Sequence, residues 1–486
     1  MLNSVRPMQL PAVVDQLRKI AGRDAVLDRP EDLMLYEYDA GVRKCTPVAV
    51  VFPQNTNQVA QIMKLAGSAA FPVVARGAGT GLSGGAIAPE GGVVVAFARM
   101  NRILAVDAEN MRAVVQPGVV NQQLSENVAH LGLYFAPDPS SQKACTIGGN
   151  VAENSGGPHT LAYGVTVNHV TGLTVVMPDG EVVHFGGRAA ESDGYDLTGF
   201  CVGSEGTIGI VTEITVRLLR RPERVATLLG IFETADDGAR TVSAITAAGI
   251  TPAALEMLDG WTLRAVEAAC HAGYPLDAGA VLLIELEGLA EQVEEQADAV
   301  REVCLQQKAR EVRRAKDENE RALLWKGRKN AFAALGRLAP SYYSQDGVVP
   351  RTKIPAVLQF IEGVAKKYGL RIGNIFHAGD GNLHPLILFD PRDPAQLEVV
   401  QAAGAEILER CVAMGGSITG EHGVGLEKRN LMPLLFTDDD LDVMLSLHNA
   451  FNAEGVLNPG KLFPTTRMCR ETTGPSGNPV LAAEGM

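Results

Sequence analysis

The sequence predicts an α+β protein, and three observations support this fold class. Short apolar strands recur along the chain with only occasional amphipathic helices between them, unlike the regular alternation of a doubly wound sheet. Glycine-rich turns connect several of these strands. The composition shifts after Arg220-Arg221-Pro222, where we expect a domain boundary. The 486 residues are enough for two or three domains.

Composition and charge exclude several classes of protein. The net charge of −13 and the pI near 5.3 argue against nucleic acid and anionic membranes as partners. The apolar runs are strand-sized, so we do not expect an integral membrane protein. The N-terminus lacks the apolar core of a signal peptide, which favours a cytoplasmic location. The seven cysteines form no C-x-x-C, which argues against a disulfide framework, an iron–sulfur cluster or a zinc–cysteine site.

The first 135 residues predict short strands with occasional helices between them. Apolar residues from Leu10 to Ile20 fall on one helical face, and Gly22 ends that helix. Asn55 with Gln58 resembles a capping box that opens a second helix through Leu65. We further expect a strand over 48–52, a hairpin of 103–106 with 111–116, and a helix capped by Asn121 that ends at Gly132.

The stretch Val73–Gly85 predicts a phosphate-binding loop. Its nine residues from Gly77 to Gly85 include five glycines, which permit positive φ and a close approach of the backbone to an anion. Gly79, Gly81 and Gly84 formally satisfy G-x-G-x-x-G, but a second apolar strand over 92–97 follows instead of the helix that a Rossmann loop opens. We therefore predict strand, phosphate loop, strand, with an ordinary surface turn as the alternative.

Two further segments before the expected boundary carry polar and glycine-rich sequence. Residues 136–164 show little periodicity, and a loop of that length inside a compact domain is usually functional. A hairpin of 170–177 with 182–185 follows, across Pro178-Asp179-Gly180. The glycine-rich turn 203–209 then leads into a strand over 210–218.

These motifs carry a family resemblance. R-G-A-G-T-G-L-S-G-G, then P-D-P-S-S with T-I-G-G-N-V-A-E-N-S-G-G, then G-S-E-G-T-I-G-I-V-T resemble the vanillyl-alcohol-oxidase/PCMH superfamily of FAD-linked oxidases. Within it, the sequence is most similar to the flavin subunits of bacterial glycolate oxidases and to the D-lactate and D-2-hydroxyglutarate dehydrogenases. The resemblance spans about residues 48–463.

The resemblance implies a PCMH-type FAD-binding domain of two α+β subdomains over 1–224, with the pyrophosphate on 76–85 and the isoalloxazine near 146–154. Many relatives tether the flavin covalently to a histidine, and Thr80 stands about where that histidine would be, so non-covalent FAD is implied. The implied cofactor contacts are Arg76, Gly77, Gly79, Thr80, Gly81, Ser83, Gly84, Pro137, Ser140, Thr146, Gly148, Gly149, Asn150, Asn154, Gly157, Glu205, Gly206, Ile210, Asn458 and Lys461.

The second half predicts a substrate or cap domain over 225–420. Strands over 228–232, 253–258 and 281–287 alternate with helices, an order that resembles a ferredoxin-like layer. A final helix begins at Thr437 and ends at Phe451. By resemblance, residues 421–464 return to the flavin domain, so the cap domain is an insertion. Residues 465–486 are predicted to be a disordered tail.

Arg328 is a candidate substrate ligand on the helix that begins at Glu318. From the sequence alone, Trp325-Lys326-Gly-Arg328-Lys329 also fits a solvated basic face. The family places a substrate arginine in this motif, and a guanidinium grips a carboxylate bidentately. Relatives specific for a second carboxylate carry polar residues just downstream, near Phe332 and Ser344 here, which argues against a dicarboxylate substrate.

The segments 374–388 and 414–425 predict a metal site. Asp380-Gly381 is a type I′ hairpin signal that would set His377 directly opposite His384, close enough to share a divalent ion. Two histidines satisfied within a core are the alternative. Glu421 offers a carboxylate, and a His/His/Glu set suits zinc, iron or manganese. The resemblance assigns the metal to His377, His384 and Glu421, and places His422 beside the substrate hydroxyl.

The combined expectation is an FAD-dependent oxidation of a small 2-hydroxy acid to the 2-oxo acid, with Arg328 and His422 as catalytic residues. No second redox motif is present, so we expect the electrons to leave to an outside acceptor. The resemblance implies that this acceptor is an iron–sulfur protein, an electron-transfer flavoprotein or a quinone-linked partner, and such partners could hold the protein at a membrane. Alternatives are a metal-dependent hydrolase, a non-catalytic flavin subunit of a larger complex, and an oxidase of aryl alcohols or sugars.

Overall fold

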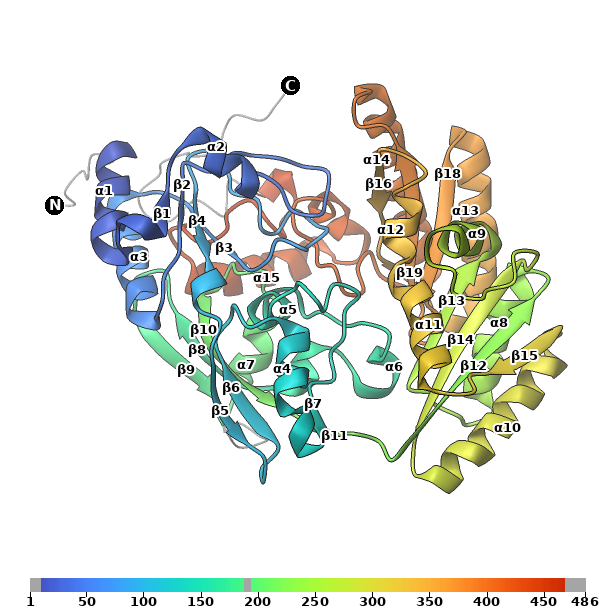
Figure 1. Ribbon diagram of the computed structural model, residues 1–486. Coiled ribbons are helices and arrows are strands. Elements are labelled where there is room, and N and C mark those ends of the chain that lie inside the picture. The colour runs from blue at the N-terminus through green and yellow to red at the C-terminus, as the bar shows by residue number, and fades with distance from the viewer. Residues whose placement is uncertain (1–9, 188–193, 468–486) are drawn as a thin grey trace. The chain divides into compact units, whose positions relative to one another are not determined.

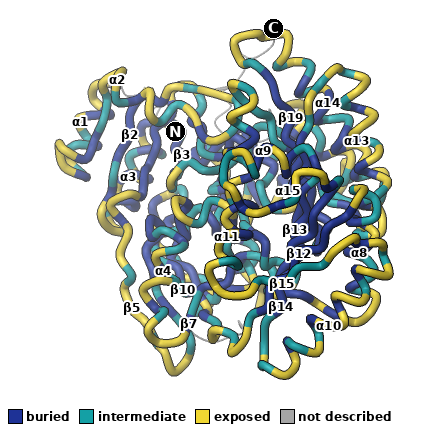
Figure 2. Tube along the Cα trace, turned by 45° about the vertical axis from the view of Figure 1, so that its right-hand side comes forward, coloured by how far each residue is buried: buried dark blue, intermediate teal, exposed yellow. Residues whose placement is uncertain are grey.

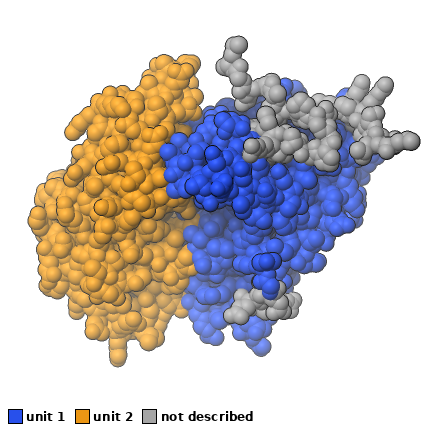
Figure 3. Space-filling view, turned by 180° about the vertical axis from the view of Figure 1, so that it is seen from behind, with its two compact units in different colours: residues 1–155, 165–220, 421–486 blue, residues 156–164, 221–420 orange. Residues whose placement is uncertain are grey.

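The computed structural model describes residues 10–187 and 194–467. The chain divides into two compact units, which Figure 3 distinguishes by colour. Unit 1 comprises residues 1–155, 165–220 and 421–486, and unit 2 comprises residues 156–164 and 221–420. Each unit has its own sheets and its own core, and each is described below by itself.

The glycine loop belongs to a four-stranded mixed sheet in unit 1 (Figure 1). Its strand order is β1 (Val26–Leu27), β2 (Ala49–Val51), β4 (Val93–Ala96), β3 (Val73–Arg76). Strands β2 and β3 both run parallel to β4, so the loop 77–92 connects neighbouring parallel strands without a helix, as predicted. The helices that bury apolar residues in the same core are α1 (Leu10–Ala21) and α3 (Thr56–Ala69), and Asn55 caps α3 as predicted.

The second sheet of unit 1 is five-stranded and antiparallel. Its order is β5 (Ile103–Asp107), β6 (Arg112–Val115), β10 (Ile210–Arg217), β8 (Val170–Val176), β9 (Val182–Gly186), and both predicted hairpins are confirmed. Two short strands, β7 (Leu133–Tyr134) and β11 (Leu219–Arg220), pair beside it. The remaining helices of unit 1 are α2 (Pro30–Leu33), α4 (Asn121–Val128), α5 (Ile147–Glu153), α7 (Leu197–Cys201) and α15 (Asp438–Phe451).

Two sequence predictions for unit 1 were wrong. Asn121 is the first residue of α4 and does not cap it, because its buried amide donates to the Pro137 carbonyl and to Asn150 Oδ1, both at 2.9 Å. The stretch 136–164 is not structureless, since it contains α5 and α6 (Thr160–Tyr163). Glycines lower helix propensity and hide α5 in the sequence, but Gly148 is needed there because a Cβ would lie 2.5 Å from Pro117 Cβ.

Unit 2 is built on an eight-stranded antiparallel sheet. The order is β15 (Glu311–Arg314), β12 (Arg224–Phe232), β14 (Ala280–Gly288), β13 (Ala254–Asp259), β18 (Arg371–His377), β19 (Asn382–Phe389), β16 (Ser341–Ser344), and β17 (Gly347–Val348) also pairs with β19. The first four strands have the ferredoxin-like order that the sequence predicts, and the hairpin β18–β19 extends them.

Helices cover both faces of this sheet. Leu229 and Ile231 of β12 share a core with α9 (Gly260–Cys270), α11 (Glu318–Lys329) and α12 (Ala331–Leu335). Gly230 and Phe232 alternate to the opposite face, where they meet α8 (Ala235–Ala247) and α10 (Ala290–Gln306). The other long helices are α13 (Ile354–Tyr368) and α14 (Pro394–Ala413). Figure 2 shows the buried central strands and the exposed outer surface of α10.

The return of the chain to unit 1 adds α15, whose first turn is capped by Thr437 as predicted. Of the predicted disordered tail, Thr465–Arg467 form a short 3₁₀ turn, and residues 468–486 lie outside the described residues. Among the helices that the structure describes, none is long and apolar enough to cross a membrane.

Candidate functional site

The glycine loop of unit 1 is shaped by contacts that only glycine allows. Gly79 has φ +70°, and a Cβ there would lie 2.1 Å from Arg76 Nη2. A Cβ on Gly77 would lie 2.3 Å from Thr146 Oγ1. Arg76 is buried, and its Nη1 has no hydrogen-bond partner among the described residues. Because a buried guanidinium N–H without an acceptor is costly, this cradle fits an anionic group such as a pyrophosphate.

Asn458 and Lys461, predicted as cofactor contacts, reach the backbone around the glycine loop. Asn458 Nδ2 donates to the carbonyls of Gly85 and Glu205, at 3.0 and 2.7 Å. Lys461 Nζ donates to the Ile87 carbonyl at 2.8 Å. These bonds fasten the C-terminal part of unit 1 to the loop, so the two residues shape the cradle from outside.

The predicted contacts between 137 and 157 have structural partners of their own. Thr146 Oγ1 caps α5 by accepting from the Gly149 N–H, and Asn150 is buried against Asn121. Asn154 adopts φ +54° and accepts from the Val167 N–H at 2.9 Å. Gly157 lies in the segment 156–164, which belongs to unit 2. The polar loop is therefore held by more internal hydrogen bonds than its sequence suggests.

The other predicted cofactor contacts lie in unit 1 with varied exposure. Ser140 is exposed, Ser83 and Ile210 are buried, and Gly206 adopts φ +69°. Thr80 and Gly81 are half-buried. These positions line the same glycine-rich turns from which the resemblance was drawn.

Glu205 occupies an unexpected position. Its Oε1 accepts from the Val424 N–H at 2.6 Å and its Oε2 from the Gly425 N–H at 2.7 Å, within unit 1. Burial raises the pKa of Glu205, whereas these two hydrogen bonds and the neighbouring cations Lys428 and Lys461 lower it. Both oxygens act as acceptors, which is the arrangement of an ionised carboxylate.

In unit 2, His377 and His384 lie on one face of the hairpin β18–β19. They are not directly opposite as predicted, because His377 pairs with Asn382 and His384 with Ile375. The turn spans four residues, 378–381, rather than two, which shifts the register. The histidines are instead diagonal neighbours with ring centroids 5.0 Å apart, a separation that still allows both to bind one metal ion.

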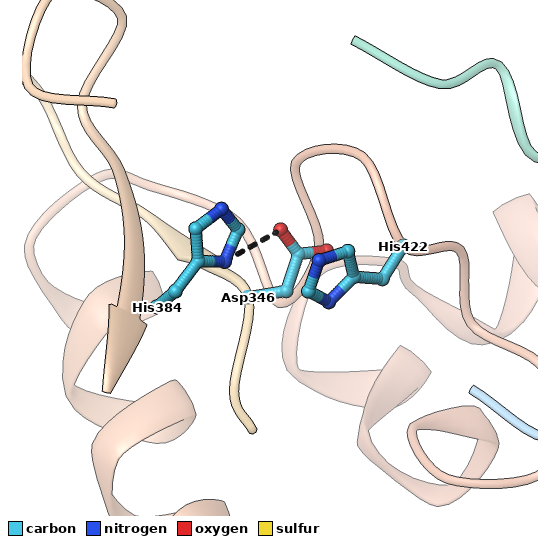
Figure 4. Close-up of side chains that lie close together, drawn as sticks. All are labelled: Asp346, His384 and His422. Carbon is cyan, nitrogen blue, oxygen red and sulfur yellow. Dashed lines mark ion pairs between the residues drawn. The ribbon is translucent and has the colours of Figure 1, made fainter. Parts of the chain in front are cut away.

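Each imidazole has an acceptor beside Nδ1. His377 Nδ1–H donates to the buried carboxylate of Glu256 at 2.9 Å. His384 Nδ1–H donates to the Gln345 carbonyl at 3.3 Å, and this nitrogen lies 3.9 Å from Asp346 Oδ1, the contact drawn as a dashed line in Figure 4. This tautomer puts the lone pair on Nε2, the form in which histidine binds metals, so the donor set fits a divalent ion.

Arg328 is fully buried at the C-terminal end of α11, which contradicts the alternative of a solvated basic face. Its Nη2 forms an ion pair with Glu256 and lies 3.4 Å from His377 Nδ1. Nε and Nη1 have no hydrogen-bond partner among the residues that the structure describes. A guanidinium that keeps two donors unsatisfied inside a protein fits the capture of an anionic ligand.

Asp346 links the histidine hairpin to the end of unit 2. This fully buried carboxylate accepts from Asn382 Nδ2 at 2.9 Å, from Thr419 Oγ1 at 2.6 Å and from the Gly420 N–H at 2.9 Å. Glu421 follows Gly420 directly, so its Cα lies about 3.8 Å further along the chain. His422 comes next, with Nε2 3.9 Å from Glu421 Oε1.

Glu256 and Asp346 are the residues that sequence reasoning missed. Glu256 is a charged residue inside the largely apolar strand β13, and Asp346 directly precedes the short strand β17. A lone carboxylate within an apolar run is the only signal that could have identified Glu256. Nothing in the spacing of Asp346 distinguishes it from the other aspartates of the chain.

Comparison with known proteins identifies the family of this chain. A family described as "FAD binding domain" matches residues 47–186, and one described as "FAD linked oxidases, C-terminal domain" matches residues 221–462. The glycolate oxidase subunit GlcD of Escherichia coli K12 is 46% identical over 92% of this chain and 90% of its own length. The protein of that name from Bacillus subtilis is 43% identical over 93% of this chain and 96% of its own length.

The chain is also similar to a more distant relative and to a solved structure. A D-lactate dehydrogenase of Anaerostipes hadrus is 31% identical over 93% of this chain and 97% of its own length. The fold is that of p-cresol methylhydroxylase, whose solved structure superposes with a TM-score of 0.82 at 18% identity over 96% of this chain and 99% of that one. The chain therefore belongs to the FAD-linked oxidases, with an FAD-binding domain of the PCMH type.

Proposed function

We propose that this protein oxidises a small 2-hydroxy acid of the glycolate or D-lactate type to the 2-oxo acid and passes the electrons to an external acceptor. The names of its relatives, glycolate oxidase subunit and D-lactate dehydrogenase, support this reaction class. The observation that carries the substrate class is the buried Arg328, whose Nε and Nη1 have no acceptor among the described residues.

The FAD would be held without a covalent bond in unit 1, on the loop 76–85 and the turns that resemble those of the family. A divalent metal, zinc, iron or manganese, would be held by His377, His384 and Glu421. The domains follow as residues 1–224 for FAD binding, 225–420 for the substrate, and 421–464 for the return to the FAD domain. The metal assignment rests on the tautomers of the two histidines and on the continuity of Gly420 with Glu421.

Side chains of the protein would bind the substrate and accept its proton. Arg328 binds the substrate carboxylate through an N–H of Nη1 or Nε, which lack acceptors among the described residues, while Glu256 holds Nη2. His422 takes the proton of the substrate hydroxyl, a task for which an imidazole is well matched near neutral pH. When bound, the metal would lower the hydroxyl pKa and the flavin would accept the Cα hydride at N5.

The alternatives lack comparable support. A metal-dependent hydrolase would not explain an FAD-binding domain that matches residues 47–186. A non-catalytic flavin subunit would have no use for a buried arginine with unsatisfied donors. We propose partner subunits or a soluble electron carrier as the acceptor, and a cytoplasmic location with contact to the membrane only through such partners.

The test is the visible spectrum of the purified protein, before and after anaerobic addition of glycolate, D-lactate, L-lactate and D-2-hydroxyglutarate. We expect flavin bands that bleach with glycolate or D-lactate and persist with the dicarboxylate. Flavin bands that none of the acids bleaches would reject the proposed reaction, and absence of flavin after reconstitution would reject FAD itself.

A further inference from the structure

The segment Glu421–Lys428 carries two of the proposed site residues and is attached to unit 1 by its backbone. Ser83 Oγ lies 2.9 Å from both the His422 and Gly423 carbonyl oxygens, which share its single O–H donor. The Ser83 carbonyl in turn accepts from the Leu426 N–H at 2.8 Å. Ser83 thus ties this segment to the glycine loop, on the carbonyl side of His422.

Glu205 binds the next part of the same segment from a different turn. Its two carboxylate oxygens accept from the Val424 and Gly425 N–H groups, at 2.6 and 2.7 Å. Hydrogen bonds to a buried ionised group are among the strong ones in proteins, and a bidentate pair also fixes direction. The backbone from 422 to 425 therefore has a fixed path over the glycine loop.

The packing leaves no room for a different path. A Cβ on Gly423 would lie 2.7 Å from Glu205 Oε1, and a Cβ on Gly425 would lie 2.1 Å from the Ser83 carbonyl oxygen. Both glycines have positive φ, +82° and +51°. The segment passes so close to Ser83 and Glu205 that only glycine fits at these positions.

The backbone of Glu205 is itself held in an unfavourable conformation. Its φ of +53° is left-handed, which is uncommon for a residue with a side chain. Its N–H donates to the Ala152 carbonyl at 2.8 Å and its carbonyl accepts from Asn458 Nδ2 at 2.7 Å. Strain of this kind persists where the surroundings enforce it, and it clusters at functional sites.

We propose that Glu205 is a positioning residue: its carboxylate fixes the backbone of 423–425 and thereby orients His422 and Glu421, and it does not contact FAD. This differs from its expected role as a cofactor contact, and it rests on the hydrogen bonds that both oxygens accept from the protein. The inference deepens the proposed function and rests on it for the roles of His422 and Glu421.

The chain offers a matched control in Glu153. Its carboxylate lies against the same glycine, because a Cβ on Gly423 would be 2.3 Å from Glu153 Oε2, yet that oxygen has no hydrogen-bond partner among the described residues. Burial and the nearby Glu205 charge raise the pKa of Glu153 well above its ordinary value. Glutamine therefore resembles the native side chain at 153, whereas at 205 it replaces an acceptor by a donor that faces an N–H.

The first measurement is amide hydrogen exchange of the FAD-bound protein, read from peptides that cover 419–428. We expect Glu205→Gln to accelerate exchange at Val424 and Gly425 by about 10- to 100-fold, the range for losing a hydrogen bond to a charged group. Glu153→Gln should leave exchange within about threefold of wild type. Because this readout needs no substrate, it tests the attachment even if the proposed reaction is wrong.

The second measurement separates positioning from cofactor binding. In Glu205→Gln we expect the Kd for FAD to stay within about threefold of the wild-type value. Anaerobic reduction of the flavin by glycolate or D-lactate should slow by about 10- to 100-fold. The Kd for added Zn²⁺ should rise by a similar factor. Glu205→Asp keeps the charge but is one methylene shorter, so we expect losses of flavin reduction and Zn²⁺ affinity between those of wild type and Glu205→Gln. This variant replaces Glu205→Gln in the experiment if the latter does not fold.

Two outcomes would overturn the inference. Loss of FAD from Glu205→Gln with unchanged exchange at 424–425 would make Glu205 a flavin ligand. Equal effects of Glu153→Gln and Glu205→Gln would make both merely structural. Faster exchange in Glu205→Gln combined with a wild-type flavin that no 2-hydroxy acid reduces would support the attachment and reject the proposed function, so the two failures are distinguishable.

Discussion

At the scale of single residues, the site of unit 2 depends on how three buried groups share charge. Glu256 accepts the His377 Nδ1–H and pairs with Arg328, so one carboxylate neutralises the guanidinium and sets the imidazole tautomer. A buried charge without a partner costs several kcal/mol, which explains why the three occur together. The two remaining donors of Arg328 are what this pairing leaves for a ligand.

The substitution Arg328→Lys should weaken substrate binding more than it weakens the fold. A lysine keeps the charge near Glu256 but lacks the planar fork, so we expect KM for glycolate or D-lactate to rise at least about tenfold. Lys326→Gln removes a positive charge two residues away on the exposed face of α11 and should leave KM unchanged. Steady-state kinetics decide, and an unchanged KM in Arg328→Lys would contradict the assignment.

Asp39, beside the glycine loop, is expected to make the stability of the fold depend on pH. Burial raises the pKa of Asp39 to about 6, against the lowering by the Gly41 N–H and by Arg76. Its carboxyl binds a proton more tightly in the folded than in the unfolded chain, where the pKa is near 3.9. Its contribution to stability is therefore full below pH 4 and is lost as the pH rises through 6, by up to about 3 kcal/mol.

Asp39→Asn should remove this contribution to the pH dependence. Asparagine keeps the oxygen that accepts from the Gly41 N–H at 2.8 Å and cannot ionise. We expect urea unfolding at saturating FAD to show a smaller fall in stability between pH 5 and pH 7.5 in the variant than in wild type. Parallel pH curves for the two proteins would show that the carboxyl titrates normally.

The residue scale also shows the limit of the sequence. Arg328, His377, His384 and Glu421 could be named because a family motif surrounds each. Glu256 and Asp346 could not, because they act through these residues and lie on strands or turns whose neighbours are known only after folding. Glu205 was predicted as a cofactor contact because its turn resembles a flavin-binding motif, and nothing in the sequence indicates that its carboxylate also binds a segment 219 residues later.

At the scale of elements, the hairpin β18–β19 sets the geometry of the histidines. Both strands are almost wholly buried, and their apolar residues predicted them well. The register could not be predicted, because Asp380-Gly381 signals a two-residue turn and the chain uses four residues, 378–381. In that turn Gly381 adopts φ +80° beside the Val349 carbonyl.

Gly381→Ala should therefore distort the hairpin. A Cβ would lie 2.0 Å from the Val349 carbonyl oxygen at a φ that side chains avoid, so we expect a loss of at least about 1–3 kcal/mol and weaker metal binding. The matched control is Gly363→Ala in the exposed face of α13, where nothing lies within 4 Å. That change should stabilise by about 0.5–1 kcal/mol. Thermal unfolding distinguishes them, and similar shifts in both would contradict the argument.

At the scale of the whole molecule, the chain moves between its two units more often than the sequence reveals. Composition and family resemblance predicted an insertion over 225–420 and a return at 421, where the structure has 221–420 in unit 2. The excursion of 156–164 into unit 2 could not be predicted in this way, because it depends on tertiary contacts: His159 binds Glu285 at 3.2 Å, and Tyr163 hydrogen-bonds Glu287. No periodicity in the sequence marks these pairs.

Because each unit has its own apolar core, we expect two transitions in differential scanning calorimetry rather than one. FAD should raise the transition of unit 1, by about 2.7 kcal/mol of stability at 100 times its Kd, because the glycine loop lies there. Gly381→Ala should lower the midpoint temperature of the other transition, and this shift would assign that transition to unit 2. A single transition that responds equally to FAD and to Gly381→Ala would contradict this expectation and would mean that the two units unfold together.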